Sequence, residues 1–240
     1  MQTHSVIDAE IAQFNALAAR WWDETGPMRP LHMMNGPRAA WVGERISRRF
    51  PLGTRLLDVG CGAGLLSEAL ARQGYDVLGL DAGADVIAAA QAHAEGQGLT
   101  LAYRNGTAEA LAAEGVTFPV ITALEIIEHV ADPVEFLGSL ASLLAPGGLL
   151  FLSTLNRTPA SYMVAKLGAE YILRLLPVGT HDWRRFLTPA ELARHVRDAG
   201  LAVGEIAGLS PDLIRGGWRI GRDLRVNYLV AATAASQVRR

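Results

Sequence analysis

From Arg55 onward, short runs rich in Leu and Val alternate with Ala-rich stretches whose apolar positions recur at helical spacing. This alternation predicts βαβ units and a mostly parallel sheet. The predicted strands are residues 55–59, 76–80, 100–103, 120–124, 149–154, 202–206 and 227–231. The predicted helices are residues 65–73, 84–95, 133–144 and 190–199.

Two stretches interrupt this rhythm. Residues 6–22 carry apolar side chains on one face of a predicted amphipathic helix, where Trp21 and Trp22 either fold over a ligand or pack on the sheet. Residues 158–186 separate the fifth strand from the last helix. We therefore expect one domain over residues 1–240, with a helical cap over about 6–50 and an inserted segment over about 158–187.

Composition narrows the class of protein. Half of the residues are apolar, 19% are charged and the net charge is −2, which is typical of an ordinary globular protein and disfavours nucleic acid as a partner. The one cysteine, Cys61, excludes an intramolecular disulfide and suits a reducing cytoplasm. We see neither a signal peptide nor a run of about 18 apolar residues, so we expect a cytoplasmic protein.

The stretch L-L-D-V-G-C-G-A-G, residues 56–64, follows the first strand and has the spacing Gly60-x-Gly62-x-Gly64. The dinucleotide fingerprint needs its third glycine one place later, where this chain has Leu65, and the loop has no Lys or Arg for a phosphate. The loop therefore suits a nucleoside without phosphates. A tight turn that binds no ligand is the alternative.

Asp81 ends the second predicted strand, which neighbours the first in a doubly wound sheet. Its carboxylate would lie beside the glycine loop and could accept both hydroxyls of a ribose, although Asp is also common as a cap of the helix that follows. Asp58, the glycine loop and Asp81 together resemble motif I of class I methyltransferases. That resemblance implies S-adenosylmethionine as cofactor and a Rossmann-like α/β fold, with a seven-stranded, mostly parallel sheet whose last strand is antiparallel.

Several longer stretches resemble one family, the ubiquinone biosynthesis O-methyltransferases. They are F-N-A-L-A-A-R-W-W at 14–22, P-L-H at 30–32, residues 35–38, L-E-I-I-E-H-V at 124–130, S-T-L-N-R at 153–157, G-A-E-Y-I-L-R at 168–174, G-T-H-D at 179–182 and V-N-Y at 226–228. The resemblance implies methylation of hydroxyls on polyprenylated phenols or catechols at two steps of the pathway. It also implies contact with other enzymes of ubiquinone biosynthesis.

The same resemblance assigns four residues to the cofactor pocket: Arg38, Gly60, Asp81 and Leu124. Arg38 would bind the carboxylate of the methionine moiety, a role that suits a guanidinium. Leu124 would pack against the cofactor after the fourth strand. Without the resemblance, Arg38 would be read as a surface arginine and Leu124 as a core residue.

The acceptor hydroxyl needs help to lose its proton, because a phenol has a pKa near 10. Glu125, Glu128 and His129 follow the fourth strand, and in a helix they would share one face. They could bind Mg²⁺ and through it the catechol oxygen. Alternatively, His129, aided by Glu128, is the general base, or these residues are helix caps and ion pairs. His181 is a second candidate base.

Residues 161–176 predict an amphipathic helix with a broad apolar face, and Arg184 and Arg185 follow it. A lipid-like substrate favours peripheral contact of this segment with an anionic membrane, at the inner face of the cytoplasmic membrane. The alternative is a lid that packs on the protein itself. Three other functions stay open: a different small-molecule methyltransferase, a nicotinamide oxidoreductase and a non-catalytic scaffold.

Overall fold

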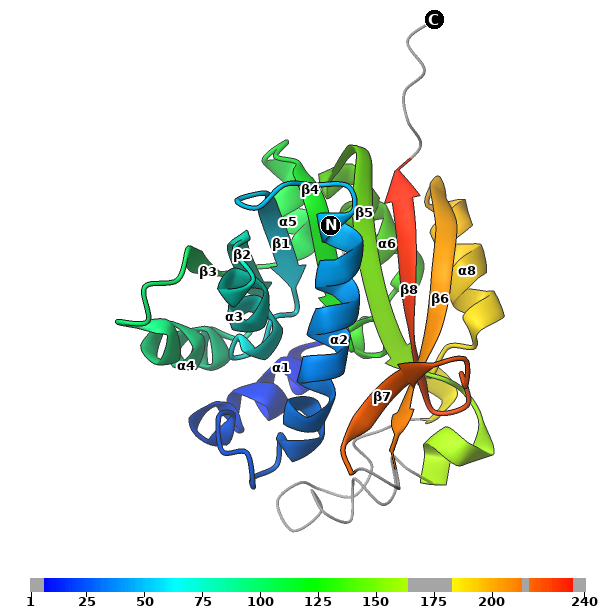
Figure 1. Ribbon diagram of the computed structural model, residues 1–240, viewed down its shortest axis with the longest axis horizontal. Helices are drawn as coiled ribbons and strands as arrows, with labels where there is room; N and C mark the ends of the chain where they lie inside the picture. Colours follow the sequence, from blue (N-terminus) through cyan, green and yellow to red (C-terminus); the bar gives the residue numbers. More distant parts are fainter. Residues whose placement is uncertain (1–6, 164–182, 213–215, 235–240) are drawn as a thin grey trace, which may run out of the picture.

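The computed structural model describes residues 7–163, 183–212 and 216–234. Its centre is one sheet of eight strands in the order β3-β2-β1-β4-β5-β8-β6-β7 (Figure 1). The strands are β1 (Arg55–Val59), β2 (Asp76–Asp81), β3 (Leu101–Asn105), β4 (Phe118–Leu124), β5 (Leu144–Leu155), β6 (Leu201–Pro211), β7 (Trp218–Gly221) and β8 (Asn227–Ala234).

The first five strands pair in parallel, whereas β8 lies antiparallel between β5 and β6. In Figure 1 the arrows of β5 and β8 point in opposite directions. This mixed, mostly parallel sheet confirms the predicted fold class. The predicted number of seven strands was one too few, because the four-residue β7 pairs with β6 at the edge of the sheet and is too short to leave a pattern in the sequence.

Helices cover both faces of the sheet. Consecutive β1 residues point to opposite faces, so Leu56 enters a core shared with α2 (Arg29–Ser47) and α3 (Leu65–Arg72), and Leu57 enters the larger core on the other face. That larger core includes side chains of α5 (Ala108–Ala113), α6 (Pro133–Leu143) and α8 (Pro189–Asp198). A third cluster joins α4 (Ala84–Ala94) to the N-terminal segment.

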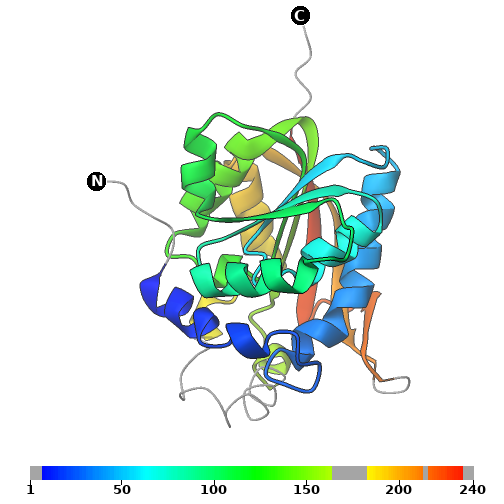
Figure 2. The same cartoon turned by 90° about the vertical axis from the view of Figure 1, so that its left-hand side faces the viewer.

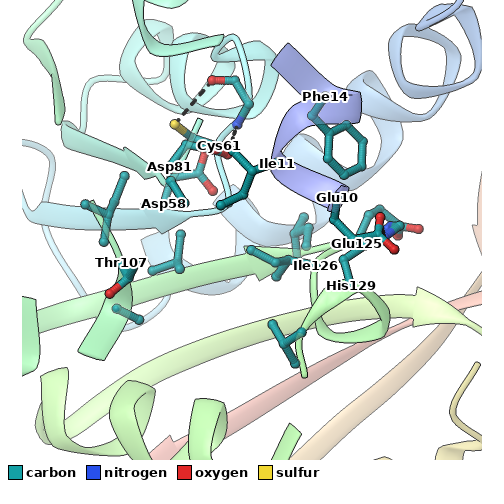
Figure 3. A pocket seen from close by; sticks show the side chains of 18 of the residues that line it. Glu10, Ile11, Phe14, Asp58, Cys61, Asp81, Thr107, Glu125, Ile126 and His129 are labelled. Atoms are coloured by element: carbon teal, nitrogen blue, oxygen red, sulfur yellow. Dashed lines mark hydrogen bonds and ion pairs between the residues drawn. The ribbon is translucent and has the colours of Figure 1, made fainter. Parts of the chain in front are cut away.

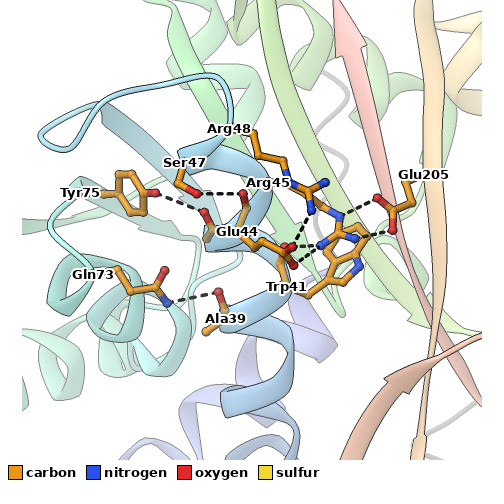
Figure 4. A network of polar contacts seen from close by, with 10 residues as sticks. Ala39, Trp41, Glu44, Arg45, Ser47, Arg48, Gln73, Tyr75 and Glu205 are labelled. Atoms are coloured by element: carbon orange, nitrogen blue, oxygen red, sulfur yellow. Dashed lines mark hydrogen bonds and ion pairs between the residues drawn. The ribbon is translucent and has the colours of Figure 1, made fainter.

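Polar contacts fix helix α2 on one face of the sheet (Figure 4). On one side, the Gln73 amide and the Tyr75 hydroxyl donate to carbonyl oxygens of α2, at 3.2 and 3.3 Å. On the other, the Arg45 guanidinium donates to the Glu205 carboxylate of β6 and lies 3.9 Å from the centre of the Trp41 ring. The helix is therefore held on both flanks, and this positions Arg38, one turn before Trp41.

The N-terminal segment differs from the single helix predicted over residues 6–22. Helix α1 (Asp8–Asn15) ends at Asn15, whose side-chain oxygen accepts from the amides of Asp85 and Val86 at the start of α4, at 3.2 and 3.4 Å. A short 3₁₀ helix, η1 (Ala18–Arg20), then leads to Trp21 and Trp22. Figure 2 shows this segment lying across one end of the sheet.

Most of the inserted segment, including the predicted helix over 161–176 beyond residue 163, lies outside the described residues. The 3₁₀ helix η3 (Trp183–Arg185) follows it. Within the described ranges, no helix combines the length and the apolar character needed to cross a membrane.

Candidate active site

The three glycines of the loop after β1, Gly60, Gly62 and Gly64, all have positive φ angles. Gly60 and Gly62 have φ angles of 69° and 54°, and the amides of Gly60 and Cys61 both donate to the Leu80 carbonyl, at 2.8 and 3.2 Å. A Cβ at Gly60 would lie 2.2 Å from Ile126 Cδ1, and one at Gly62 would lie 2.3 Å from Trp21 Cζ2. Only glycine therefore combines this backbone with the close approach of its neighbours.

Asp81 ends β2 beside this loop, as the sequence predicted. Its Oδ2 accepts from the Gly62 amide at 2.9 Å and its Oδ1 accepts from the Gly83 amide at 2.8 Å. Burial raises the pKa of the Asp81 carboxyl, and the two amide donors oppose that rise. Each carboxylate oxygen has a second lone pair, so Asp81 keeps the capacity to accept from a ligand.

Arg38 reaches the same cavity from helix α2. It is only 5% exposed, and its Nε donates to Asn35 Oδ1 at 3.3 Å. Burial lowers the pKa of its guanidinium, while the charges of Glu125 and Asp58 raise it. Within the described ranges Arg38 forms no ion pair at contact distance. A buried arginine that lines a cavity and forms no such ion pair is suited to bind an anionic ligand.

Asp58 forms hydrogen bonds with two buried hydroxyl groups. Its carboxylate accepts from the Ser67 hydroxyl at 2.6 Å and from the Thr122 hydroxyl at 2.7 Å. These bonds tie the end of β1 to α3 and β4 beneath the glycine loop. Asp58 therefore supports the floor of the cavity.

A cavity of about 150 Å³ lies between these residues and helix α1. Six predicted site residues line it: Arg38, Gly60, Asp81, Leu124, Glu125 and His129. Figure 3 shows Asp58, Cys61 and Asp81 at one end, and Glu125 and His129 at the other. The structure thus brings together residues from α2, from the loop after β1 and from the ends of β2 and β4.

The sequence did not single out two groups of lining residues. Residues 106–109, which follow β3, line the cavity, and so do Ile7, Glu10, Ile11 and Phe14 of the N-terminal segment. The apolar face predicted over residues 6–22 indicated that this segment packs against the sheet or a ligand. It carried no signal for Glu10, a polar side chain of that segment.

Glu125 is the only described non-glycine residue with a positive φ, at 56°. The Ser153 hydroxyl donates to its carboxylate, and the Asn227 side-chain amide donates to both of its oxygens, at 2.9 and 2.8 Å. The Glu125 amide itself donates to Ser153. These bonds to β5 and β8 hold the residue in a conformation that a side chain rarely adopts.

Glu128 lies away from the cavity lining and is 6% exposed. The Thr154 hydroxyl donates to its Oε2 at 2.9 Å. Burial, with the nearby Glu125 charge, raises the pKa of Glu128 to about 7. Its catalytic role stays a prediction, since the carboxyl faces β5 in this structure.

His129 lines the cavity and contacts α1. Its Nδ1 lies 3.0 Å from Glu10 Oε2, and its ring meets the Phe14 ring edge to face, with centroids 5.2 Å apart. Burial lowers the pKa of the imidazole, but Glu10, Glu128 and Glu125 outweigh burial and raise the pKa above its ordinary value. His129 is therefore a charged or readily protonated group at the cavity wall.

The predicted metal ligands do not gather into one set. The segment after β4 is the 3₁₀ helix η2 (Ile127–His129) rather than an α-helix, and Glu125 precedes it with a left-handed backbone. Glu125, Glu128 and His129 consequently turn to β8, β5 and α1. In the part of the chain that the structure describes, no three His, Cys, Asp or Glu side chains form a group that could hold a metal ion.

The paired tryptophans, which were predicted to fold over a ligand or to pack on the sheet, have different surroundings. Trp21 lines the cavity and is 5% exposed. Trp22 stacks on His93 with centroids 3.4 Å apart, and its Nε1 donates to the Ala63 carbonyl at 3.0 Å. Trp22 thus fastens the segment to α4 and the glycine loop, whereas Trp21 faces the site. The second candidate base, His181, lies outside the described residues.

Comparison with known proteins identifies relatives of the whole chain. A family model described as a methyltransferase domain matches residues 34–206. The ubiquinone biosynthesis O-methyltransferase of Cereibacter sphaeroides is 47% identical over 98% of this chain and 100% of its own length. The enzyme of that name from Azorhizobium caulinodans is 46% identical over 98% of this chain and 97% of its own.

Among solved structures, magnesium protoporphyrin IX methyltransferase from Synechocystis, with bound SAH, superposes with a TM-score of 0.68. It shares 19% identity over 95% of this chain and 99% of its own. At this identity the likeness shows the fold alone.

Proposed function

This chain belongs to the family of ubiquinone biosynthesis O-methyltransferases, and from that premise we propose that it methylates hydroxyls of polyprenylated phenols and catechols at both O-methylation steps. It is an S-adenosylmethionine-dependent methyltransferase. One observation supports the site assignment above others: the buried guanidinium of Arg38 and the carboxylate of Asp81 line the same cavity. A nucleoside that carries an amino acid has a carboxylate that matches Arg38 and ribose hydroxyls that match Asp81.

Arg38 would bind the carboxylate of the methionine moiety, and Asp81 would accept hydrogen bonds from the ribose hydroxyls. Gly60 lets the backbone approach the ligand without a Cβ, and Leu124, at the end of β4, offers an apolar contact. S-adenosylmethionine supplies the electrophilic methyl group. The cavity residues hold the donor and acceptor in line, which alone can account for much of the acceleration.

His129 would take the proton of the acceptor hydroxyl. It lies on the cavity wall, and imidazole is the side chain whose ordinary pKa best suits proton transfer near neutral pH. Glu125 places negative charge beside it and stabilises the imidazolium that forms, and Glu128 adds to this effect when it is ionised. The apolar side chains of Ile11 and Phe14 exclude water from this end of the cavity.

Mg²⁺ at Glu125, Glu128 and His129 would require these side chains to leave their present partners, so no step here uses a metal. The matched test is turnover with and without EDTA in wild type and in Glu125→Gln. A metal role predicts that EDTA inactivates the wild type. Full activity in EDTA rejects it.

We further propose peripheral contact with the inner face of the cytoplasmic membrane. Tyr162, Met163 and Trp183, which are described residues of the inserted segment, are 50%, 62% and 37% exposed. Exposed aromatic and apolar side chains beside Arg185 suit the interface of an anionic membrane. Flotation with anionic and neutral vesicles tests this. The variant is Tyr162→Ser with Trp183→Ser, and the control is Leu52→Ser, at an exposed site in the turn between α2 and β1. Contact with other ubiquinone-biosynthesis enzymes would be tested by co-purification with and without membranes.

Titration calorimetry with S-adenosylhomocysteine and with NADH tests the cofactor assignment. We expect binding of the first and not of the second, and a loss of at least about tenfold in affinity for Arg38→Met, because a charge-assisted bond is lost. Binding of NADH alone would support the oxidoreductase alternative instead.

A further inference from the structure

We propose that Glu10 is a positioning residue for methyl transfer: from helix α1 its carboxylate accepts a hydrogen bond from Nδ1–H of His129 and so presents Nε2 to the acceptor hydroxyl. This inference rests on the proposed function and adds a residue that the sequence did not indicate. It is carried by the 3.0 Å contact between Glu10 Oε2 and His129 Nδ1 (Figure 3).

The contact determines which tautomer His129 adopts. An ionised carboxylate can only accept hydrogen bonds, so the ring nitrogen that faces Glu10 must carry a proton. In the neutral ring the other nitrogen, Nε2, is then the one that can accept a proton. Glu10 also lies close enough to stabilise the positive charge that His129 gains when it takes the substrate proton.

The ring is restrained in a second direction. Phe14, one helical turn after Glu10, meets the imidazole edge to face at an interplanar angle of 86°. The polar contact fixes where Nδ1 points, and the aromatic contact fixes the plane of the ring. Two residues of α1 therefore orient a group that belongs to η2.

Glu10 is itself held in place. Its second oxygen, Oε1, lies 3.3 Å from the Arg185 guanidinium of η3. The side chains of Glu10 and His129 are 19% and 18% exposed, so this pair is better shielded from water than an ordinary surface ion pair. The cluster Glu10, His129 and Arg185 thus joins three segments that are far apart in the chain.

Packing of α1 depends on these contacts. None of its eight residues is fully buried, and Phe14 supplies the contact of the helix with the apolar cluster beside α4. Asn15 fastens its end to α4, and Glu10 provides a polar attachment at the cavity. Since Glu10 belongs to the cap, the imidazole has this orientation only when α1 lies over the cavity.

The test measures kcat and KM for methyl transfer to a short-chain prenyl catechol, together with affinity for S-adenosylhomocysteine. We expect Glu10→Ala to lower kcat about 30- to 100-fold, within the range that a general base contributes. Glu10→Gln, which can still accept from Nδ1 but carries no charge, should lose about tenfold. Asp8→Asn, a matched loss of charge on the same helix, should stay within about twofold of wild type.

A double-mutant cycle separates positioning from a structural role. If Glu10 acts through His129, Glu10→Ala should have no further effect on kcat in a His129→Ala background. S-adenosylhomocysteine affinity should change less than about twofold in both Glu10 variants, which also shows that they fold. Arg185→Gln should reproduce part of the loss in kcat.

Additive losses in the cycle, or wild-type kcat in both Glu10 variants, would overturn the inference while leaving the proposed function intact. An equal loss of cofactor affinity and kcat would also overturn it, because it would indicate a general disturbance of the cap. A wild-type protein that binds S-adenosylhomocysteine but methylates no phenol would contradict the proposed function, and this inference with it.

Discussion

Replacing Glu128 with Gln tests the electrostatics of the segment after β4. Burial raises the pKa of this carboxyl from its ordinary 4.5 to about 7. In the unfolded chain it ionises at its ordinary pKa, so between these two values only the folded protein keeps the proton. The stabilising effect of that retained proton is present at low pH and is lost as the pH rises to about 7.

The magnitude follows from the two pKa values. Their difference corresponds to about 3 kcal/mol of unfolding free energy, of which most should appear between about pH 5 and about pH 8.5. Gln keeps the size of the side chain and does not titrate. The free energy of unfolding of Glu128→Gln, relative to wild type, should therefore rise by about 2 to 3 kcal/mol over that range.

Urea unfolding followed by circular dichroism at both pH values gives the four free energies needed. Glu24→Gln, at an exposed position, is the control and should show no such rise. A difference between Glu128→Gln and wild type that does not change with pH would refute the reasoning. It would mean that the buried carboxyl is already ionised at low pH through partners stronger than Thr154.

The remaining predictions concern the glycine loop. Asp81→Asn should weaken S-adenosylhomocysteine binding about 30-fold by calorimetry, since an amide cannot accept from Gly62, Gly83 and a ribose together; unchanged affinity would remove the ribose role. Gly62→Ala should weaken S-adenosylhomocysteine binding at least about tenfold, because its Cβ would lie 2.3 Å from Trp21; unchanged affinity would contradict this steric clash. Cys61→Ser should keep wild-type kcat, because burial raises the pKa of this thiol well above its ordinary value and keeps it protonated; lost turnover with intact binding would reopen a role for the thiol.

The sequence predicted the sheet well because its strands are short apolar runs that each satisfy a local rule. Apolar runs mark buried strands, and the helical spacing between them marks the crossovers. The same is true of Asp81, which could be placed beside the glycine loop because neighbouring parallel strands end at one edge. Both predictions follow from the hydrophobic periodicity and from the order of the strands, which can be read from a single sequence.

Helix α2 shows where the local rules failed. The predicted helical cap over about 6–50 contains this 19-residue helix, but its bounds could not be predicted, because Gly36 and Pro37, residues that usually end a helix, both lie inside it. Contacts from Gln73, Tyr75 and Glu205 stabilise it, and those partners lie 32 to 160 residues away. Tertiary contacts of this kind leave no local pattern.

The site showed the same limit. Glu125, Glu128 and His129 are close in sequence, and a helix would have placed them on one face. Bonds from Ser153 and Asn227 to Glu125 instead turn the three side chains apart. Conversely, Glu10 lies 119 residues from His129, so only the fold could bring the pair together.

Transfer of labelled methyl from S-adenosylmethionine to a short-chain prenyl catechol tests the central claim most directly. We expect label on the catechol oxygen with the wild-type protein, and a loss of at least about tenfold in rate with His129→Ala. Binding of S-adenosylhomocysteine should survive in that variant. A wild-type protein that binds the cofactor product and leaves every phenol and catechol unlabelled would contradict the account.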